Sequence, residues 1–267
     1  MKGLLISCGV ALMAVSANAT TVGYCVVGGG STCITGATST AAATVIASAG
    51  MTGQLLGGLS AANLTGIDVL WILNSNNGTP GTAVTGNVAD ITAFVNSGHV
   101  LSFHDRNVNQ GGVSAATYLP GGGGISFTNL PGTNIDIQTA GTLVTNGTFG
   151  TITNTTLDGG NQSDHGFATI GSLPAGAVAI LNNGTAGQIV DFYYRFGAGA
   201  VYYSSIPMDF YLTGGNDPPR TSFLNIYAPN ELTLQASLGV PEPGTFVLVS
   251  GGILGLGLLR RRFFKQA

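Results

Sequence analysis

Two short segments of this chain combine side chains that could perform acid–base or metal chemistry. His104, Asp105 and Arg106 follow one another after an apolar run, which brings a base, a carboxylate and a guanidinium together. Histidine titrates near neutral pH, and a guanidinium can hold an anion through two parallel hydrogen bonds. Further along, Asp164 and His165 end a stretch rich in Gly, Asn and Ser. Two histidines and two carboxylates are an adequate ligand set for a transition metal, so the hypothesis is a hydrolytic or metal site where these segments meet.

The same residues also have a structural interpretation, which we favour. In a chain with so few charges, Arg106 can simply form an ion pair with Asp105 or Asp164, because perturbed charges mark structure as well as function. The oxygen-rich segment 158–165 lacks the acidic density of a calcium loop. The sequence therefore assigns no catalytic residue and predicts no cofactor, with a divalent metal of unknown identity as the alternative.

Charge is scarce between residues 20 and 239. That region contains ten acidic residues, three arginines and no lysine. A surface with so few cations offers no electrostatic footprint for a phosphate backbone, which argues against nucleic-acid binding. The apolar content of the whole chain, 44%, is too high for an intrinsically disordered protein.

Both ends of the chain have the features of targeting segments. Residues 1–19 join a single lysine, an apolar run and a small-x-small cleavage site, as in a removable signal peptide. Residues 245–259 are apolar and uncharged, and three arginines follow them, which predicts a short transmembrane helix with a cytoplasmic, arginine-rich end. The expected localisation is export with an inner-membrane anchor at the C-terminus before processing, and then the envelope, cell surface or extracellular matrix.

Three blocks follow one another in residues 240–267. They are Pro241-Glu242-Pro243, the apolar stretch, and Arg260-Arg261-Arg262. In this order the segment resembles the PEP-CTERM sorting signal of Gram-negative bacteria. The resemblance implies recognition by an exosortase, a membrane-embedded cysteine protease or transpeptidase that cuts near the Pro-Glu-Pro motif. It also implies that the membrane and extracellular polysaccharide are further partners.

Cys25 and Cys33 are the two cysteines outside the predicted signal segment. Their separation of eight residues fits a small disulfide loop in an oxidising compartment. Two buried free thiols are the alternative interpretation.

Apolar strands and helix-period segments alternate along residues 20–239. Strands are expected at 22–27, 67–73 and 99–104, with helices at 38–49 and 84–96 between them. Near-continuous apolar strands separated by helices predict a mostly parallel sheet covered on both faces. Residues 107–175 are rich in Gly, Thr and Asn and predict an insertion of loops and short strands. Strands return at 177–181, 189–194 and 200–205, before a final helix at 221–236 that Pro229 must kink or start.

Three of these segments share a pattern with a group of α/β domains. They are Ile67-Asp68-Val69-Leu70-Trp71, residues 94–101, and residues 197–204. In these segments the chain resembles a flavodoxin-like, doubly wound domain of the class I glutamine-amidotransferase-like superfamily. Members that hydrolyse glutamine use a cysteine on a strand-to-helix turn and a late His-Glu pair. This chain has no cysteine after Cys33 and no late His-Glu pair, so the resemblance does not extend to that activity.

Three function hypotheses follow from these patterns. The preferred one is a non-catalytic surface or matrix protein, processed by an exosortase-type system and linked to extracellular polysaccharide. The second is an exported hydrolase that uses the His104, Asp105, Asp164 and His165 region. The third is a sugar-binding module in which aromatic residues between 192 and 211 stack on sugars. Convergence of the four polar residues in an open pocket would favour the second, and a groove of exposed tyrosines the third.

Overall fold

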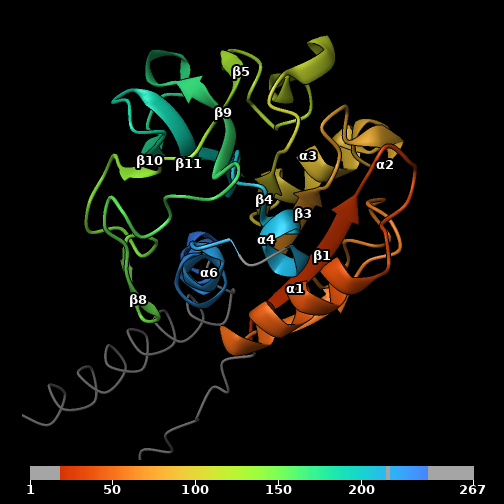
Figure 1. The fold of residues 1–267 in the computed structure, drawn as a ribbon. Coiled ribbons are helices and arrows are strands. Elements are labelled where there is room, and N and C mark those ends of the chain that lie inside the picture. Colours follow the sequence, from red (N-terminus) through yellow and green to blue (C-terminus); the bar gives the residue numbers. More distant parts are fainter. Residues whose placement is uncertain (1–18, 215–216, 240–267) are drawn as a thin grey trace, which may run out of the picture.

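The computed structural model describes residues 19–214 and 217–239 of the 267-residue chain (Figure 1). Apart from Ala19, the predicted signal peptide lies outside the described residues, and so does the whole segment 240–267 with its motif and arginines. In the part of the chain that is described, no helix combines the length and the apolar character that a membrane span requires.

The domain is a mixed α/β fold built on a mostly parallel central sheet. Strands β1 (Thr21–Val27), β3 (Val69–Asn74), β4 (Val100–His104) and β12 (Gly199–Ser204) lie side by side in parallel. The short strand β2 (Thr52–Leu55) adds to the outer edge of β1, also in parallel. This arrangement confirms the α/β class and the mostly parallel sheet expected from the sequence.

Helices cover both faces of the sheet. Helices α1 (Ala37–Ser48), α4 (Met208–Thr213) and α6 (Ala228–Leu238) pack on one face, and α2 (Gly81–Thr85) and α3 (Val88–Asn96) pack on the other. Because successive strand residues point to opposite faces, each central strand contributes to two separate cores. All six residues of β3 are buried, as a strand covered on both sides requires.

Beyond β12 the sheet is antiparallel. Strand β11 (Gln188–Phe196) pairs antiparallel with β12, and β10 (Val178–Asn182) and β6 (Asp136–Ile137) continue the sheet in the same manner. The reason is the two-residue turn between β11 and β12, which is too short for the crossover that a parallel pair needs. Gly197 in this turn has a φ of 56°, a left-handed conformation that glycine adopts without steric cost.

Residues 107–175 form short strands and single helical turns, which extend in Figure 1 from the top of the molecule down its left side to the neighbourhood of α6. Strand β5 (Phe127–Gly132) pairs with β9 (Asp164–Thr169), which in turn joins the end of β11. The remaining elements of this region are β7 (Asn146–Gly147), β8 (Gly150–Thr151), η1 (Gln110–Gly112), η2 (Ala115–Thr117) and η3 (Ile170–Ser172).

Two helices differ from the sequence expectation. The expected helix at 84–96 is two helices, α2 and α3, which are interrupted at Gly86 and Asn87. Helix α2 begins at Gly81 (φ 70°), where a Cβ atom would lie 2.3 Å from the carbonyl oxygen of Gly30, so only glycine fits. The sequence contains no signal for β2 or α4, since both are short and lack a clear apolar period.

The final helix is continuous but irregular. It runs from α5 (Arg220–Ser222) through the π-helical turn η4 (Phe223–Tyr227) into α6. Pro229 lies in the first turn of α6, and the wider turn precedes it because proline supplies no N–H for the regular ladder.

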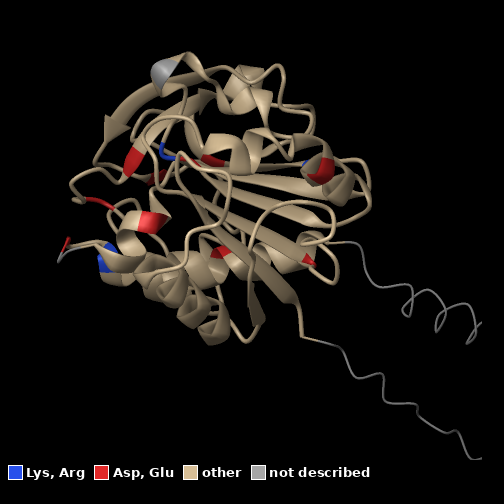
Figure 2. Cartoon of the chain, turned by 90° about the vertical axis from the view of Figure 1, so that its right-hand side faces the viewer, with Lys and Arg blue, Asp and Glu red and all other residues tan. Residues whose placement is uncertain are grey.

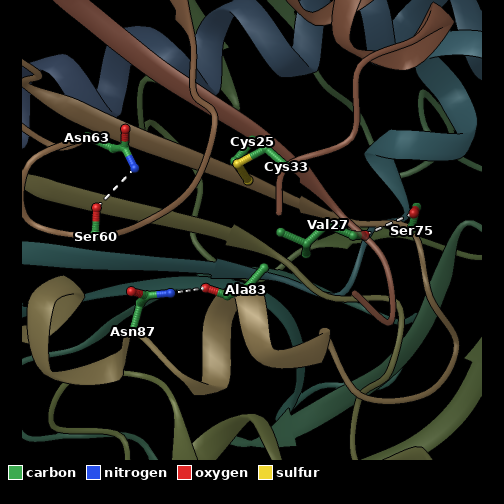
Figure 3. Close-up of a disulfide and its surroundings, with 8 residues drawn as sticks. All are labelled: Cys25, Val27, Cys33, Ser60, Asn63, Ser75, Ala83 and Asn87. Carbon is green, nitrogen blue, oxygen red and sulfur yellow. Dashed lines mark hydrogen bonds between the residues drawn. A yellow bond between two sulfur atoms is a disulfide. The ribbon is translucent and has the colours of Figure 1, made fainter. Parts of the chain in front are cut away.

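A disulfide joins Cys25 in β1 to Cys33 in the loop that follows (Figure 3). Cys25 is fully buried on the face of the sheet that α2 and α3 cover. The bridge closes the glycine-rich loop after β1, and the Ile34 N–H donates to the Val26 carbonyl at 2.8 Å beside it.

Replacing both cysteines, Cys25→Ser with Cys33→Ser, should lower the free energy of unfolding by about 2–3 kcal/mol, because a short loop is no longer closed in the unfolded chain. Urea denaturation with and without a reducing agent measures this loss. Reduction should destabilise the wild type and leave the double variant unchanged. Equal stability of the oxidised wild type and the variant would contradict the structural role of the bridge.

Candidate functional site

The polar residues at the end of β4 are separated by the sheet itself. His104 is the last residue of β4, and Asp105 follows directly. Their side chains lie on opposite faces, as strand alternation requires, and each is at most 1% exposed. His104 faces α6, whereas Asp105 faces Tyr118 and Tyr203 on the other side. The two neighbours in sequence therefore belong to different polar clusters.

His104 is held through both ring nitrogens. Its Nε2 lies 2.9 and 3.0 Å from the two carboxyl oxygens of Glu231 in α6, and its Nδ1 lies 3.1 Å from the Ile206 carbonyl oxygen. A carbonyl oxygen only accepts, so Nδ1 carries a proton. Burial disfavours the charged imidazolium, but attraction to Glu231 and the hydrogen bond with it outweigh burial, and the pKa of His104 is raised above its usual value.

Two further side chains complete the surroundings of Glu231. Ser102, two residues before His104 and on the same face of β4, donates its hydroxyl to Glu231 Oε1 at 3.0 Å. Gln235, one turn further along α6, donates its amide to Ser102 Oγ at 2.8 Å and also to Glu231 Oε1.

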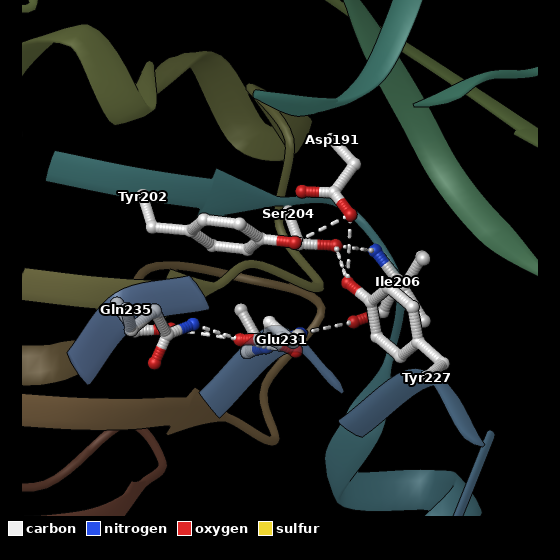
Figure 4. A network of polar contacts seen from close by, with 9 residues as sticks. Asp191, Tyr202, Ser204, Ile206, Tyr227, Glu231 and Gln235 are labelled. Carbon is white, nitrogen blue, oxygen red and sulfur yellow. Dashed lines mark hydrogen bonds and ion pairs between the residues drawn. The ribbon is translucent and has the colours of Figure 1, made fainter. Parts of the chain in front are cut away.

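Asp191 of β11 forms the other end of this cluster (Figure 4). Its Oδ2 accepts hydrogen bonds from Tyr202 at 2.6 Å and from Tyr227 at 3.0 Å. Burial, with the nearby Glu231 as a second cause, raises the pKa of Asp191 to about 8, so its carboxyl is protonated at neutral pH. We call the whole cluster the α6 network; every member is at most 1% exposed. Its members are Ser102, His104, Asp191, Tyr202, Ser204, Tyr227, Glu231 and Gln235.

Asp105 organises the chain that leaves β4. Its oxygens accept hydrogen bonds from the Asn74 amide at 3.1 Å and from the backbone N–H groups of Asn107 and Val108 at 2.9 and 3.2 Å. Hydroxyls of Tyr118 and Tyr203 donate as well, each at 3.2 Å. Burial raises the pKa of Asp105, and these hydrogen bonds lower it in part. The backbone that Asp105 holds includes a left-handed Val108, with a φ of 39°.

Arg106 and His165 are the predicted site residues that the structure brings together. Arg106 donates from Nη1 to Asp209 Oδ2 of α4 at 2.8 Å, and the Arg106 side chain is 24% exposed. His165 of β9 is held by its backbone N–H, which donates to the Ser205 carbonyl at 3.0 Å. Burial and the Arg106 charge lower the pKa of His165 to about 4. A pocket of about 30 Å³ lies between them, and its other lining residues are Asn161, Gln162, Pro207 and Phe210.

The four residues of the hydrolytic or metal hypothesis do not share one site. His104 lies under α6, Asp105 lies on the opposite face, and Asp164 precedes His165 on β9, so their side chains alternate. Asp164 Oδ1 accepts from the Gly166 N–H at 3.0 Å, and burial raises the pKa of Asp164 to about 7. Across residues 19–214 and 217–239, no three His, Cys, Asp or Glu side chains are grouped so as to hold a metal ion.

The aromatic residues of the sugar-stacking hypothesis are mostly core residues. Tyr194, Tyr202, Tyr203 and Tyr211 are each at most 1% exposed and pack against other aromatic rings or in the two cores. A hollow of about 400 Å³ lies beside β10 and is lined by uncharged residues, among them Gln138, Ile170 and Pro174. Figure 2 shows how thinly charged residues are spread over the described ribbon.

Sequence reasoning missed Glu231 and Asp191, the two acidic partners in the α6 network. A signal for both was present. Asp191 is a lone acid inside an apolar strand, and Glu231 is the one acid in the final helix segment at 221–236. A carboxyl group at a buried position requires a partner, which directs attention to the few histidines and tyrosines.

Comparisons with known proteins show a likeness of fold. No protein-family model matches the chain, and no curated protein sequence matches it. Among solved structures, Cytoplasmic Protein STM1381 from Salmonella typhimurium LT2 is similar with a TM-score of 0.50 and 9% identity, covering 83% of this chain and 100% of that one. Cytoplasmic Protein STM3548 from Salmonella typhimurium has a TM-score of 0.49 and 10% identity, with the same coverage.

These comparisons correct one prediction. Export with an inner-membrane anchor was expected from the two ends of the chain. The similar structure with a TM-score of 0.50 carries the name of a cytoplasmic protein, and residues 245–259, the expected anchor, lie outside the described residues. This finding contradicts the predicted localisation, which is not proposed again.

Stability should fall as the pH rises from about 6.5 to 8. Asp191 keeps its proton in the fold up to a pKa of about 8, whereas an aspartate in the unfolded chain loses it near pH 3.9. The folded state then binds more protons than the unfolded state, so the free energy of unfolding decreases with pH. Asp164 and His104 act in the same direction. His165 acts in the opposite direction, but only between about pH 4 and 6.5.

Urea unfolding at several pH values between 6.5 and 8 measures this slope. Asp191→Asn should flatten it, because asparagine keeps the shape of the protonated carboxyl and cannot titrate. The exposed Asp68→Asn is the matched control and should leave the slope unchanged. An equal slope in the wild type and Asp191→Asn would show that Asp191 is ionised in the fold.

Proposed function

We propose that this domain is a non-catalytic structural or binding protein, in which the α6 network stabilises the fold instead of performing a reaction. One observation carries the proposal: His104, the strongest candidate for a general base, is 1% exposed and has both ring nitrogens bonded to its own chain.

A general base must come within hydrogen-bond distance of the proton that it removes from a substrate. His104 would have to release Glu231 and part the sheet from α6 before a substrate could reach it. Such a change exposes a buried cluster of two carboxyls and an imidazole, and breaking a buried pair of this kind costs about 3–5 kcal/mol. Asp105 is equally enclosed, since five donors surround its carboxyl.

The finer fold assignment belongs to the same proposal. The strand order β2-β1-β3-β4-β12, all parallel, corresponds to the 2-1-3-4-5 order of flavodoxin-like domains. Helices on both faces support a doubly wound topology, and the class I glutamine-amidotransferase-like resemblance agrees with that order. The proposal extends to the architecture and not to glutamine hydrolysis.

The partners inferred from the tail are a separate proposal that depends on the sequence. Residues 241–243 and 260–262 lie outside the described residues, and recognition by an exosortase-type protease rests on their resemblance to a sorting signal.

Co-production with an exosortase should shorten the chain near Pro241, as mass spectrometry of the intact protein would reveal. A Pro241→Ala, Glu242→Ala, Pro243→Ala variant should keep its full length. Equal shortening of the wild type and this variant would show that the protease does not recognise the Pro-Glu-Pro motif. The link to polysaccharide stays a prediction.

Variants of the α6 network test the structural role. His104→Ala and Glu231→Ala should each lower the free energy of unfolding by about 3–5 kcal/mol, because each leaves a buried polar partner unpaired. The double variant His104→Gln with Glu231→Gln should recover part of this loss, since two amides can still bond. His99→Ala is the control: His99 is partly exposed and stacks on Phe94 outside the network. Chemical denaturation measures all four.

A catalytic role predicts a different outcome. Ester, glycoside and amide substrates would then be turned over by the wild type and not by the His104→Gln, Glu231→Gln variant at a temperature where that variant is folded. Such a loss of activity without loss of structure would overturn the proposal.

A further inference from the structure

The small pocket between Arg106 and His165 contains polar groups that the fold leaves without partners. Arg106 uses Nη1 for Asp209, while its Nε is buried and has no hydrogen-bond partner among the described residues. His165 is only 3% exposed; its ring nitrogens form no hydrogen bond in the described part of the chain but keep a small contact with solvent. Buried polar groups in folded proteins are almost always paired, so the Arg106 Nε calls for a further partner, and the His165 ring can bond to the same one.

The partner must be an acceptor of hydrogen bonds. A guanidinium only donates, and the unpaired Arg106 Nε therefore requires an acceptor atom. The imidazole of His165 stays neutral at physiological pH because burial and the Arg106 charge lower its pKa to about 4. A neutral imidazole has one nitrogen that donates, which adds a second donor beside the first. The side-chain amides of Asn161 and Gln162 line the same pocket and can donate as well.

Charge at the pocket favours a group that is not positive. Arg106 already disfavours a proton on His165, and any added cation would meet the same repulsion. Asp209 offsets part of the Arg106 charge, but its carboxylate is bonded at Nη1, where it orients the guanidinium. An anionic acceptor can therefore bind at the edge of the Arg106 guanidinium that Asp209 leaves free. Its affinity is modest, because the negative charge of Asp209 partly repels it.

Size limits what the pocket can enclose. Its volume of about 30 Å³ is somewhat more than the roughly 10–15 Å³ that one ordered water requires. A flat group of a few atoms can enter, while the rest of a ligand stays outside against Phe210 and Pro207. A carboxylate is planar and matches the fork geometry of a guanidinium, whereas a tetrahedral phosphate is larger.

We propose that the pocket at Arg106 and His165 is a binding site for the carboxylate of a small organic acid, which accepts hydrogen bonds from both side chains. The site is located at the carboxyl ends of β4 and β12, the edge at which doubly wound sheets bind ligands. This binding function is independent of the α6 network, since Arg106 and His165 are not among its members.

Acetate and acetamide are the matched probes, because they have the same shape and differ in charge. Titration of the folded protein at constant ionic strength should show acetate binding, on the order of millimolar affinity, with a shift of the His165 imidazole resonances by NMR. Acetamide and inorganic phosphate should each bind at least about tenfold more weakly, for lack of charge and for excess size respectively. Equal responses to acetate, acetamide and sodium chloride would overturn the proposal.

Variants locate the site. Arg106→Gln should weaken acetate binding by about tenfold or more, since a charged hydrogen bond is lost. Arg195→Gln is the control, because Arg195 is an exposed arginine on β11 that does not line the pocket; it should change the affinity less than about twofold. If Arg106→Gln does not fold, the variants His165→Asn and Asn161→Ala replace it, Asn161 being exposed. Calorimetry then measures the acetate affinity of each variant. Unchanged acetate affinity in His165→Asn would then refute the site.

Discussion

In a sheet that helices cover on both faces, consecutive side chains of one strand enter two separate cores. Strand β4 shows the consequence at its last residues. Ser102 and His104 face α6 and join Glu231, whereas Asp105 faces Tyr118 and Tyr203 across the sheet. The polar residues that look like one constellation in the sequence are therefore divided into two clusters, each with its own partners.

In each cluster, hydrogen bonds offset part of the unfavourable free energy of burying polar groups. A charge in the core is tolerated when it is paired and hydrogen-bonded, and the α6 network meets this condition for His104 and Glu231. Asp191 meets it in part, by keeping its proton and accepting bonds at Oδ2 from two tyrosines, while its Oδ1 has no partner among the described residues. The network connects β4, β11, β12 and the final helix, so it ties the parallel half of the sheet to the antiparallel half.

Two polar groups that line a pocket lie at the edge of the sheet. Arg106 lies just beyond the end of β4, where the chain is no longer buried between helices, and His165 reaches the same place from β9. The insertion at 107–175 thus contributes a wall of the pocket. The proposed binding site therefore depends on residues from β4 and β9, two strands far apart in sequence, while the α6 network lies in the interior.

The sequence by itself determined the class of the fold. Apolar runs at 22–27, 67–73 and 99–104, separated by helix-period segments, are sufficient for a mostly parallel sheet with helices on its faces, since local pattern decides which residues must be buried. It also selected Arg106 and His165, because charged and imidazole side chains are rare in this chain.

Only the tertiary structure decided which of these residues meet. The turn at Gly197 makes β11 antiparallel and places Asp191 beside Tyr202. The chain after β12 then returns through α4 to the final helix, where Tyr227 reaches Asp191 and Glu231 reaches His104. Contacts between residues more than a hundred positions apart, such as His104 with Glu231, leave no periodic trace in the sequence. They depend on how the chain crosses the sheet, and this is set by packing of the whole domain.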